Sequence, residues 1–226
     1  MEFSLNGFLK GFKQATPIAL GVASYGLVFG VLSKQAGLDL IPAIFMSSFV
    51  FAGASQFVAL DMWLTPLPIA AIIVTTFVVN MRHILMGAVL VEKLKGLSRF
   101  QKALSLFFLV DENWAYSLNE WKHGNQNATL LLGTGLSLFL SWNISTAIGS
   151  IIGSGNVDPV KWGIDFAFTA IFIYLATGMW RDRRDLVPWI VAAIVAVIIS
   201  KTFPGKWYIL AGSLAGSVTG VLIHDK

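Results

Sequence analysis

The sequence predicts an all-α integral membrane protein, a polytopic helix bundle with about seven spans. Three observations lead to this fold class. The chain is 56% hydrophobic and only 12% charged, whereas a soluble domain carries about 25% charged residues. Its mean hydropathy is +0.73. Uncharged runs of about 20 residues recur along it, and each is long enough to cross a bilayer as a helix. We therefore expect residues 1–226 to form a single membrane domain.

Composition also limits the classes of partner and cofactor that the chain is expected to bind. The formal net charge is +4, but the basic residues fall in short hydrophilic loops, where they act as topology signals. We therefore expect the lipid bilayer, and no nucleic acid, as the partner of this charge. The absence of cysteine removes disulfides, thiolate metal sites and cysteine nucleophiles. No metal or cofactor is expected.

The elements follow in order from the pattern of apolar runs. Met1 to Lys13 alternates apolar and polar residues, which predicts a short interfacial helix. Between 66 and 91 the only charged residue is Arg82, and between 162 and 180 it is Asp165. The eight candidate segments are 14–33, 41–60, 66–91, 103–118, 129–152, 162–180, 186–200 and 207–223.

Residues 103–118 form the weakest span, because Asp111 and Glu112 lie near its middle. The two most basic loops, 92–102 and 181–185, are both expected on the cytoplasmic side. Three crossings between them would place them on opposite sides. We therefore predict that 103–118 enters the membrane without crossing it, as discontinuous backbone buried in protein or lining a cavity.

A repeat is suggested by a shift of 119 residues, which places Gly30 on Gly149 and Asp39 on Asp158. Many transporters are built from two homologous halves, and this offset favours two inverted halves. The predicted halves and the segment that joins them are 14–91, 129–223 and 103–118. Glycines four residues apart, at 26 and 30 and again at 212, 216 and 220, predict close internal helix packing rather than a subunit interface.

Arg82 and His83 lie too deep in segment 66–91 to be a helix flank. A helix of that length is about 39 Å long at about 1.5 Å per residue, and nine residues, all but one of them apolar, still follow His83 up to position 92. Inserting a central arginine costs about 2.5–3.5 kcal/mol, so such a residue usually faces a bundle interior or an aqueous path. Asn80 adds a second polar group at the same level.

The polar residues within apolar runs are the candidate site. The predicted substrate-binding residues are Ser55, Gln56, Asn80, Arg82 and Asn143, and the predicted proton-coupling or charge-pairing residues are His83, Asp111, Glu112 and Asp165. A zwitterionic amino acid needs a cation or helix N-terminus for its carboxylate, an anion for its ammonium and apolar walls for its side chain. This set supplies the polar groups, and 17 phenylalanines supply walls.

Each of these residues also has a purely structural interpretation. Arg82 could pair with Asp111 or Glu112 as a buried ion pair. Asp165 could cap a helix near an interface. The serine and glutamine residues could form only interhelical hydrogen bonds.

Six motifs occur along the chain: TPIALG (Thr16–Gly21), YGLVFG (Tyr25–Gly30), MSSFVFAGASQF (Met46–Phe57), NMRH (Asn80–His83), DENWAYS (Asp111–Ser117) and DFAFTAIF (Asp165–Phe172). Through them the chain resembles the AzlC family of branched-chain amino-acid exporters, also called LIV-E, over most of its length. The resemblance implies the large subunit of a two-component exporter of leucine, isoleucine and valine in the cell inner membrane. It also implies a small hydrophobic partner of the AzlD type.

No ATP-binding motif of the form GxxxxGK[ST] occurs in the chain. ATP coupling within it is therefore not expected, and we expect transport to be driven by the proton gradient. Three alternatives stay open: an intramembrane enzyme, a passive channel and a structural subunit. The chain has no HExxH or GxSxG motif, so we expect no enzymatic activity. Lys10 and Lys13 favour a cytoplasmic N-terminus, whereas an external one fits the basic loops if residues 66–91 cross fully.

Overall fold

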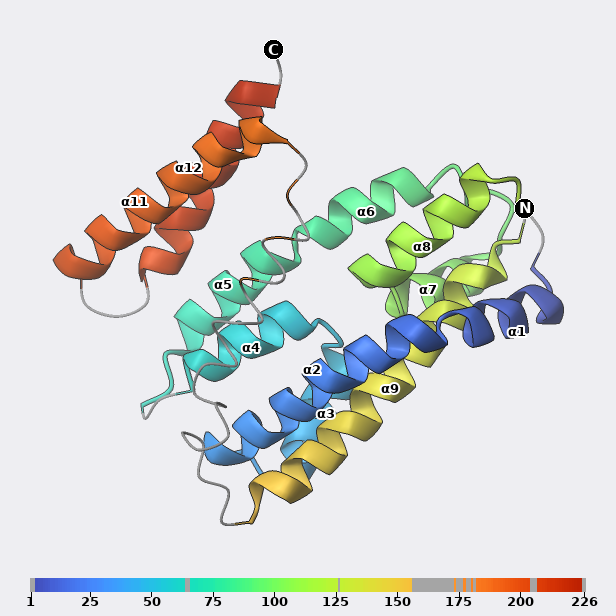
Figure 1. The fold of residues 1–226 in the computed structure, drawn as a ribbon, viewed down its shortest axis with the longest axis horizontal. Coiled ribbons are helices and arrows are strands. Elements are labelled where there is room, and N and C mark those ends of the chain that lie inside the picture. Colours follow the sequence, from blue (N-terminus) through green and yellow to red (C-terminus); the bar gives the residue numbers. More distant parts are fainter. Residues whose placement is uncertain are drawn as a thin grey trace.

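The computed structural model describes residues 3–63, 66–125, 127–155, 173, 177, 180, 182–203 and 207–224, and these fold into helices (Figure 1). The helices are α1 (Leu5–Gln14), α2 (Thr16–Gln35), α3 (Leu40–Phe49), α4 (Gly53–Asp61), α5 (Ile69–Asn80), α6 (Arg82–Leu90), α7 (Arg99–Phe107), α8 (Asp111–Lys122), α9 (Thr129–Gly153), η2 (Arg183–Asp185), α11 (Leu186–Thr202) and α12 (Trp207–His224). The all-α membrane fold predicted from composition is confirmed.

Four stretches of helix in the described residues are long and apolar enough to cross a membrane. They are α2, the continuous pair α5 and α6, α9, and α11 with the short η2 before it. These match the predicted segments 14–33, 66–91, 129–152 and 186–200. The predicted segment 207–223 forms α12. The segment predicted at 162–180, with Asp165, lies outside the described residues apart from three positions.

The predicted span 41–60 is wrong, because the chain turns back in its middle. Residues 50–52 separate α3 from α4. Leu38 and Pro42 of the first arm and Ala59 and Trp63 of the second line one pocket, so the two open ends lie on the same side of the turn. Each helix is about 15 Å long at about 1.5 Å per residue, half of a hydrocarbon core of about 30 Å. This hairpin therefore enters and leaves at the same end of the molecule.

Residues 99–122 form a second broken segment. Residues 108–110 separate α7 from α8, and neither helix reaches the length of a span. Leu97, before α7, Leu109, in the break, and Trp121, near the end of α8, belong to one buried cluster. In Figure 1, α7 and α8 both extend from the break toward the same end of the molecule, in agreement with the discontinuous segment predicted at 103–118. We call residues 50–52 and 108–110 the first and second hairpin tips.

The helices α2 and α9 pack against each other through glycines. A methyl group added at Gly30 would lie 2.9 Å from the Cα of Gly149, and one added at Gly153 would lie 3.2 Å from the Cβ of Lys34. Both pairs are 119 residues apart, so the helices run in the same direction, side by side (Figure 1). The offset found in the sequence is therefore the register of this contact.

The parallel direction of α2 and α9 tests the predicted inverted relation between the two repeat halves. Equivalent helices of inverted halves run antiparallel across the membrane, whereas α2 and α9 are parallel. The inverted relation expected at this offset therefore does not hold for this pair. The repeat halves themselves stay a prediction.

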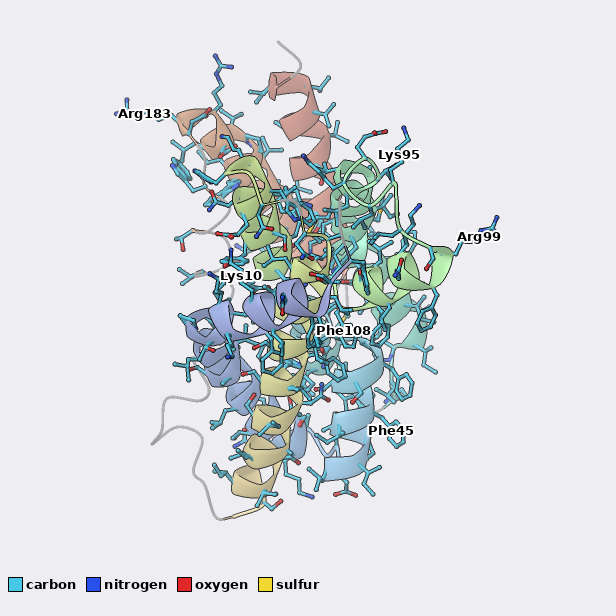
Figure 2. All side chains as sticks on the ribbon, turned by 90° about the vertical axis from the view of Figure 1, so that its right-hand side faces the viewer. Lys10, Phe45, Lys95, Arg99, Phe108 and Arg183 are labelled. Atoms are coloured by element: carbon cyan, nitrogen blue, oxygen red, sulfur yellow. The ribbon has the colours of Figure 1, made fainter. Side chains whose placement is uncertain are left out.

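The C-terminal helices form a hairpin in which the glycine face of α12 packs on α11. A methyl group at Gly212 would lie 3.0 Å from the Cβ of Ala196, and one at Gly216 would lie 2.9 Å from the Cβ of Ala192. The internal packing expected for this face is confirmed. Figure 2 shows Lys95, Arg99 and Arg183 toward one end of the molecule and Phe45 toward the other.

The hairpin formed by α3 and α4 predicts the membrane side of its two ends. Because the chain contains no cysteine, single cysteines can be placed at the exposed positions Asp39 and Asp61 without further changes. We expect both variants to be labelled by an impermeant maleimide from the same side. Lys95→Cys, at the far end of the span α5–α6, should be labelled only from the other side.

The control is labelling after detergent permeabilisation, which should modify all three positions. Labelling of Asp39→Cys and Asp61→Cys from opposite sides would mean that residues 40–61 cross the membrane, and would contradict the hairpin.

Candidate functional site

A cavity lies where the two hairpin tips meet. Phe51 of the first tip and Phe108 of the second both contact Phe139 of α9, with ring centroids 5.0 Å and 5.1 Å apart. The cavity has a volume of about 80 Å³. Its lining comes from α2, both tips and the starts of α4, α6 and α8, and α9: Val22, Tyr25, Phe51, Ala52, Gly53, Ala54, Phe57, Arg82, Val110, Asp111, Glu112, Leu138 and Trp142.

Both α4 and α8 begin beside the junction of α5 and α6. Asn80, the last residue of α5, donates to Ser55 Oγ of α4 at 3.1 Å, and Arg82, the first residue of α6, pairs with Asp111, the first residue of α8. Farther along, the indole of Trp114 donates to a carbonyl of α6 at 3.3 Å, so α8 runs alongside α6 in the same direction. Figure 1 shows α4 running the opposite way along α5.

Two helix N-termini therefore converge on the cavity from opposite directions. Gly53 begins α4 and Asp111 begins α8, and both residues line the cavity. The first N–H groups of a helix have no partner within the helix, and its N-terminus carries a partial positive charge. The cavity is thus electrostatically suited to an anionic group such as a carboxylate.

Arg82 adds a full positive charge at the same place. Its guanidinium Nη1 contacts Asp111 Oδ2, and the two side chains are 29% and 44% exposed. The Asp111 carboxylate offsets this charge within the apolar bundle. The contact uses one guanidinium nitrogen, and Arg82 Nε is buried with no partner among the described residues. Arg82 therefore keeps donors for a further acceptor.

Glu112 supplies a second carboxylate to the cavity. Its side chain lines the cavity and forms no ion pair with any described residue. Successive helical residues point about 100° apart, so Asp111 can face Arg82 while Glu112 faces elsewhere. The cavity thus combines a paired carboxylate with one that is available to a cation.

The first tip is held by Gln56, which is fully buried. Its Oε1 accepts from the Ala52 N–H at 3.2 Å, and its Nε2 donates to Ser47 Oγ at 3.2 Å. Ser47 in turn lies 3.1 Å from Thr146 Oγ1 of α9. Phe51 has φ = 41°, a conformation that costs about 1–3 kcal/mol for a residue other than glycine. These bonds over-determine the tip and keep that conformation.

The second tip is held in a similar way by Asn113. This fully buried side chain accepts from the Val110 N–H at 2.8 Å and donates to the carbonyls of Phe108 at 2.8 Å and Leu131 at 3.2 Å. Asn113 was not among the predicted site residues. Its position three residues after a helix N-cap is the signal that could have identified it.

The other predicted residues are engaged in internal hydrogen bonds. Ser55 Oγ donates to Ala52 O at 2.9 Å, Asn143 accepts from Ser48 Oγ at 2.7 Å, and His83 Nδ1 lies 3.1 Å from Asn80 O. Gln56 and these side chains do not line the cavity. The bonds of Gln56 with Ser47, of Asn143 with Ser48 and of Ser55 with Asn80 join helices, as in the interhelical alternative, whereas the contact of His83 is local. Direct contact of these side chains with a substrate stays a prediction.

The remaining walls are apolar and aromatic. Trp142 is 5% exposed and Phe57 2% exposed, and both line the cavity with Leu138 and Val110. Trp142 Nε1 is buried and has no partner in the described part of the chain. The site therefore offers an apolar surface next to its charges. No group of three or more histidine and acidic residues that could hold a metal occurs within the described ranges.

Comparison with known proteins gives consistent matches over the whole length. The family model described as "AzlC protein" matches residues 17–155. An uncharacterized membrane protein of Archaeoglobus fulgidus is 32% identical over 92% of this chain and 92% of its own length. The branched-chain amino acid transport protein AzlC of Bacillus subtilis is 28% identical, over 95% and 84%. The inner membrane protein YgaZ of Escherichia coli is 27% identical, over 95% and 90%. No solved structure matches.

The bonds of Asn113 predict a loss of stability when this side chain is removed. Asn113→Ala would remove the partner of the Val110 N–H and of the Phe108 carbonyl, while the Leu131 carbonyl keeps Thr134 Oγ1 as a donor, and each buried group left without a partner costs about 1–3 kcal/mol. We expect a lower free energy of unfolding in detergent by at least that amount. Asn119→Ala, at an exposed position of the same helix, is the matched control and should change it little. Equal effects of the two substitutions would contradict the bracing role.

Proposed function

The chain belongs to the AzlC family, and from this premise we propose that it exports branched-chain and other apolar amino acids across the inner membrane. It is a membrane protein with a role in transport. We further propose that it is the large subunit of a two-component exporter, completed by a small hydrophobic subunit of the AzlD type. In this proposal it is a transporter and not an enzyme.

The observation that carries the proposal is the combination of groups around one cavity. Arg82 and the N-termini of α4 and α8 can receive a carboxylate, and Glu112 can receive an ammonium group. Trp142, Phe57 and Leu138 supply apolar walls for a side chain. These are the three requirements of a zwitterionic apolar amino acid, met by groups from four different helices.

The arrangement of the hairpins suggests how access to the cavity alternates. Each tip separates the cavity from one end of the molecule, because the first hairpin has its open ends at one end and the second hairpin has them at the other. Movement of one tip at a time would open the cavity to one side only. A transporter requires this property, whereas a passive channel requires a continuous polar pore.

Proton coupling is proposed to use Glu112. It is a carboxylate at the cavity with no ion-pair partner among the described side chains, so a change in its charge does not break an existing pair. Asp111 is less suited to this role because it neutralises Arg82. Protonation of Glu112 would weaken its attraction for the substrate ammonium, and would thereby link substrate release to the proton gradient.

The direct test is efflux of labelled leucine, isoleucine and valine, with glutamate as the polar control, from proteoliposomes under an imposed proton gradient. The chain is reconstituted with and without the small subunit. We expect selective, gradient-dependent efflux that requires both proteins. Efflux that an ionophore does not change would indicate a channel, and no efflux from a folded complex would contradict the proposal.

Variants of the ion pair distinguish substrate binding from a structural role. Arg82→Ala and Asp111→Asn should each lower transport about tenfold or more, because a hydrogen bond to a charged group contributes about 1.5–3 kcal/mol. Arg82→Lys should retain only part of the transport activity, since a point charge cannot reproduce the hydrogen bonds of a planar guanidinium. Arg99→Ala, at an exposed position, is the control.

The double variant Arg82→Gln with Asp111→Asn removes both charges together. If the pair serves only stability, this variant should regain transport, because no unpaired charge is left. We expect it to fold and to remain inactive. Normal transport by the double variant would remove both residues from substrate binding.

A further inference from the structure

Gly53 lies directly against the indole of Trp142. It is the first residue of α4 and lines the cavity. A methyl group added at Gly53 would lie 3.1 Å from Trp142 Cη2, 3.5 Å from Cζ3 and 3.6 Å from Cζ2. The first distance is shorter than ordinary van der Waals contact, so even one extra carbon would require the ring to move.

The ring of Trp142 has little freedom to move. Phe29 stacks on it, with centroids 5.7 Å apart and planes at 26°, and Phe57 meets it edge-on at 6.3 Å and 82°. Phe29 and Phe57 also contact each other at 5.6 Å and 89°. All three residues are buried: Trp142 is 5% exposed, Phe29 0% and Phe57 2%. In a close-packed interior such a cluster resists displacement, so the position of the indole is fixed.

The charged groups decide what lies against this surface. A carboxylate held by Arg82 and the N-terminus of α4 is placed beside Gly53, the residue that begins that helix. The side chain of an amino acid is attached to the carbon that carries the carboxylate. Its first atom therefore lies two bonds from the carboxylate carbon, close to Gly53. The wall that it meets there is the indole of Trp142.

We propose that Gly53 and Trp142 set the largest side chain that the transporter accepts. This rests on the proposed function, because it assumes an amino acid with its carboxylate at Arg82. Because Gly53 has no side chain, the indole can lie directly against the start of α4, and the clamped indole limits the space that the cavity leaves for a branched side chain. One methylene in an apolar pocket changes discrimination by about 10–200-fold, so this single pair of residues can set selectivity.

The test compares labelled leucine with labelled alanine in proteoliposomes that contain the complete transporter. Gly53→Ala should lower the ratio of leucine to alanine transport about tenfold, since the added carbon fits only if the indole is displaced, which narrows the cavity for the larger side chain. Trp142→Phe should raise transport of phenylalanine relative to leucine. The double variant should recover the ratio of the unmodified protein, because the smaller ring makes room for the added methyl.

Gly87→Ala is the matched control, because a methyl group at this helical glycine would have no neighbour within 4 Å. It should leave the ratio unchanged. A purely structural effect of Gly53→Ala would lower transport of both amino acids equally, and an unchanged ratio would overturn the proposal.

Trp142→Phe keeps the proposal testable if Gly53→Ala fails to fold, since an unaltered preference in that variant would also overturn it. The outcomes separate this inference from the proposed function. Absence of amino-acid transport by the unmodified protein overturns both, whereas selective leucine transport with an unchanged ratio in the variants overturns only the size limit.

Discussion

Backbone N–H and C=O groups at membrane depth need partners, because lipid offers none. This chain interrupts its helices at two such places, residues 50–52 and 108–110, and the interruptions persist because buried side chains complete the hydrogen bonding. Gln56 binds the N–H of the first tip and Asn113 that of the second. Both side chains also tie the tips to their surroundings, directly or through Ser47, and so to α9. Without these bonds, the tips would not hold the cavity open between them.

The two hairpin tips also allow a charged site to exist within an apolar bundle. The first turns of α4 and α8 line the cavity, and an acidic pair stands at the start of α8. Arg82 lies at the junction of α5 and α6, opposite Asp111, so its charge is compensated at the depth where it would otherwise be most costly. The parallel pair α2 and α9, packed through Gly30 and Gly149, forms the scaffold against which the first tip and the cavity are built.

Much of this fold was predictable because length and lack of charge determine a span. The helices α9, α11 and α12 begin where the uncharged runs begin, and the cost of burying charge identified Arg82, Asp111 and Glu112. The reversal within residues 41–60 was not predictable from hydropathy, which measures composition and carries no direction. Ser47, Ser55 and Gln56 in the middle of that run were the only signal of a break.

The roles of Gly53, Asn113 and Trp142 could not be assigned from the sequence, for a related reason. Their importance depends on contacts made in three dimensions: a missing methyl under a ring, a side chain that closes a distant turn, and an indole fixed by two phenylalanines. The resemblance of the motifs identified the family, but it did not indicate which polar side chains face the cavity.

One substrate held between both hairpin tips would shield both tips at once. Single cysteines at Ala54 and Val110 line the cavity from the first and second hairpin, and the rate of maleimide labelling at each can be measured with and without leucine. We expect leucine to slow labelling at both positions and to leave an exposed cysteine at Lys95 unaffected. Protection of neither position, or of only one, would contradict this expectation.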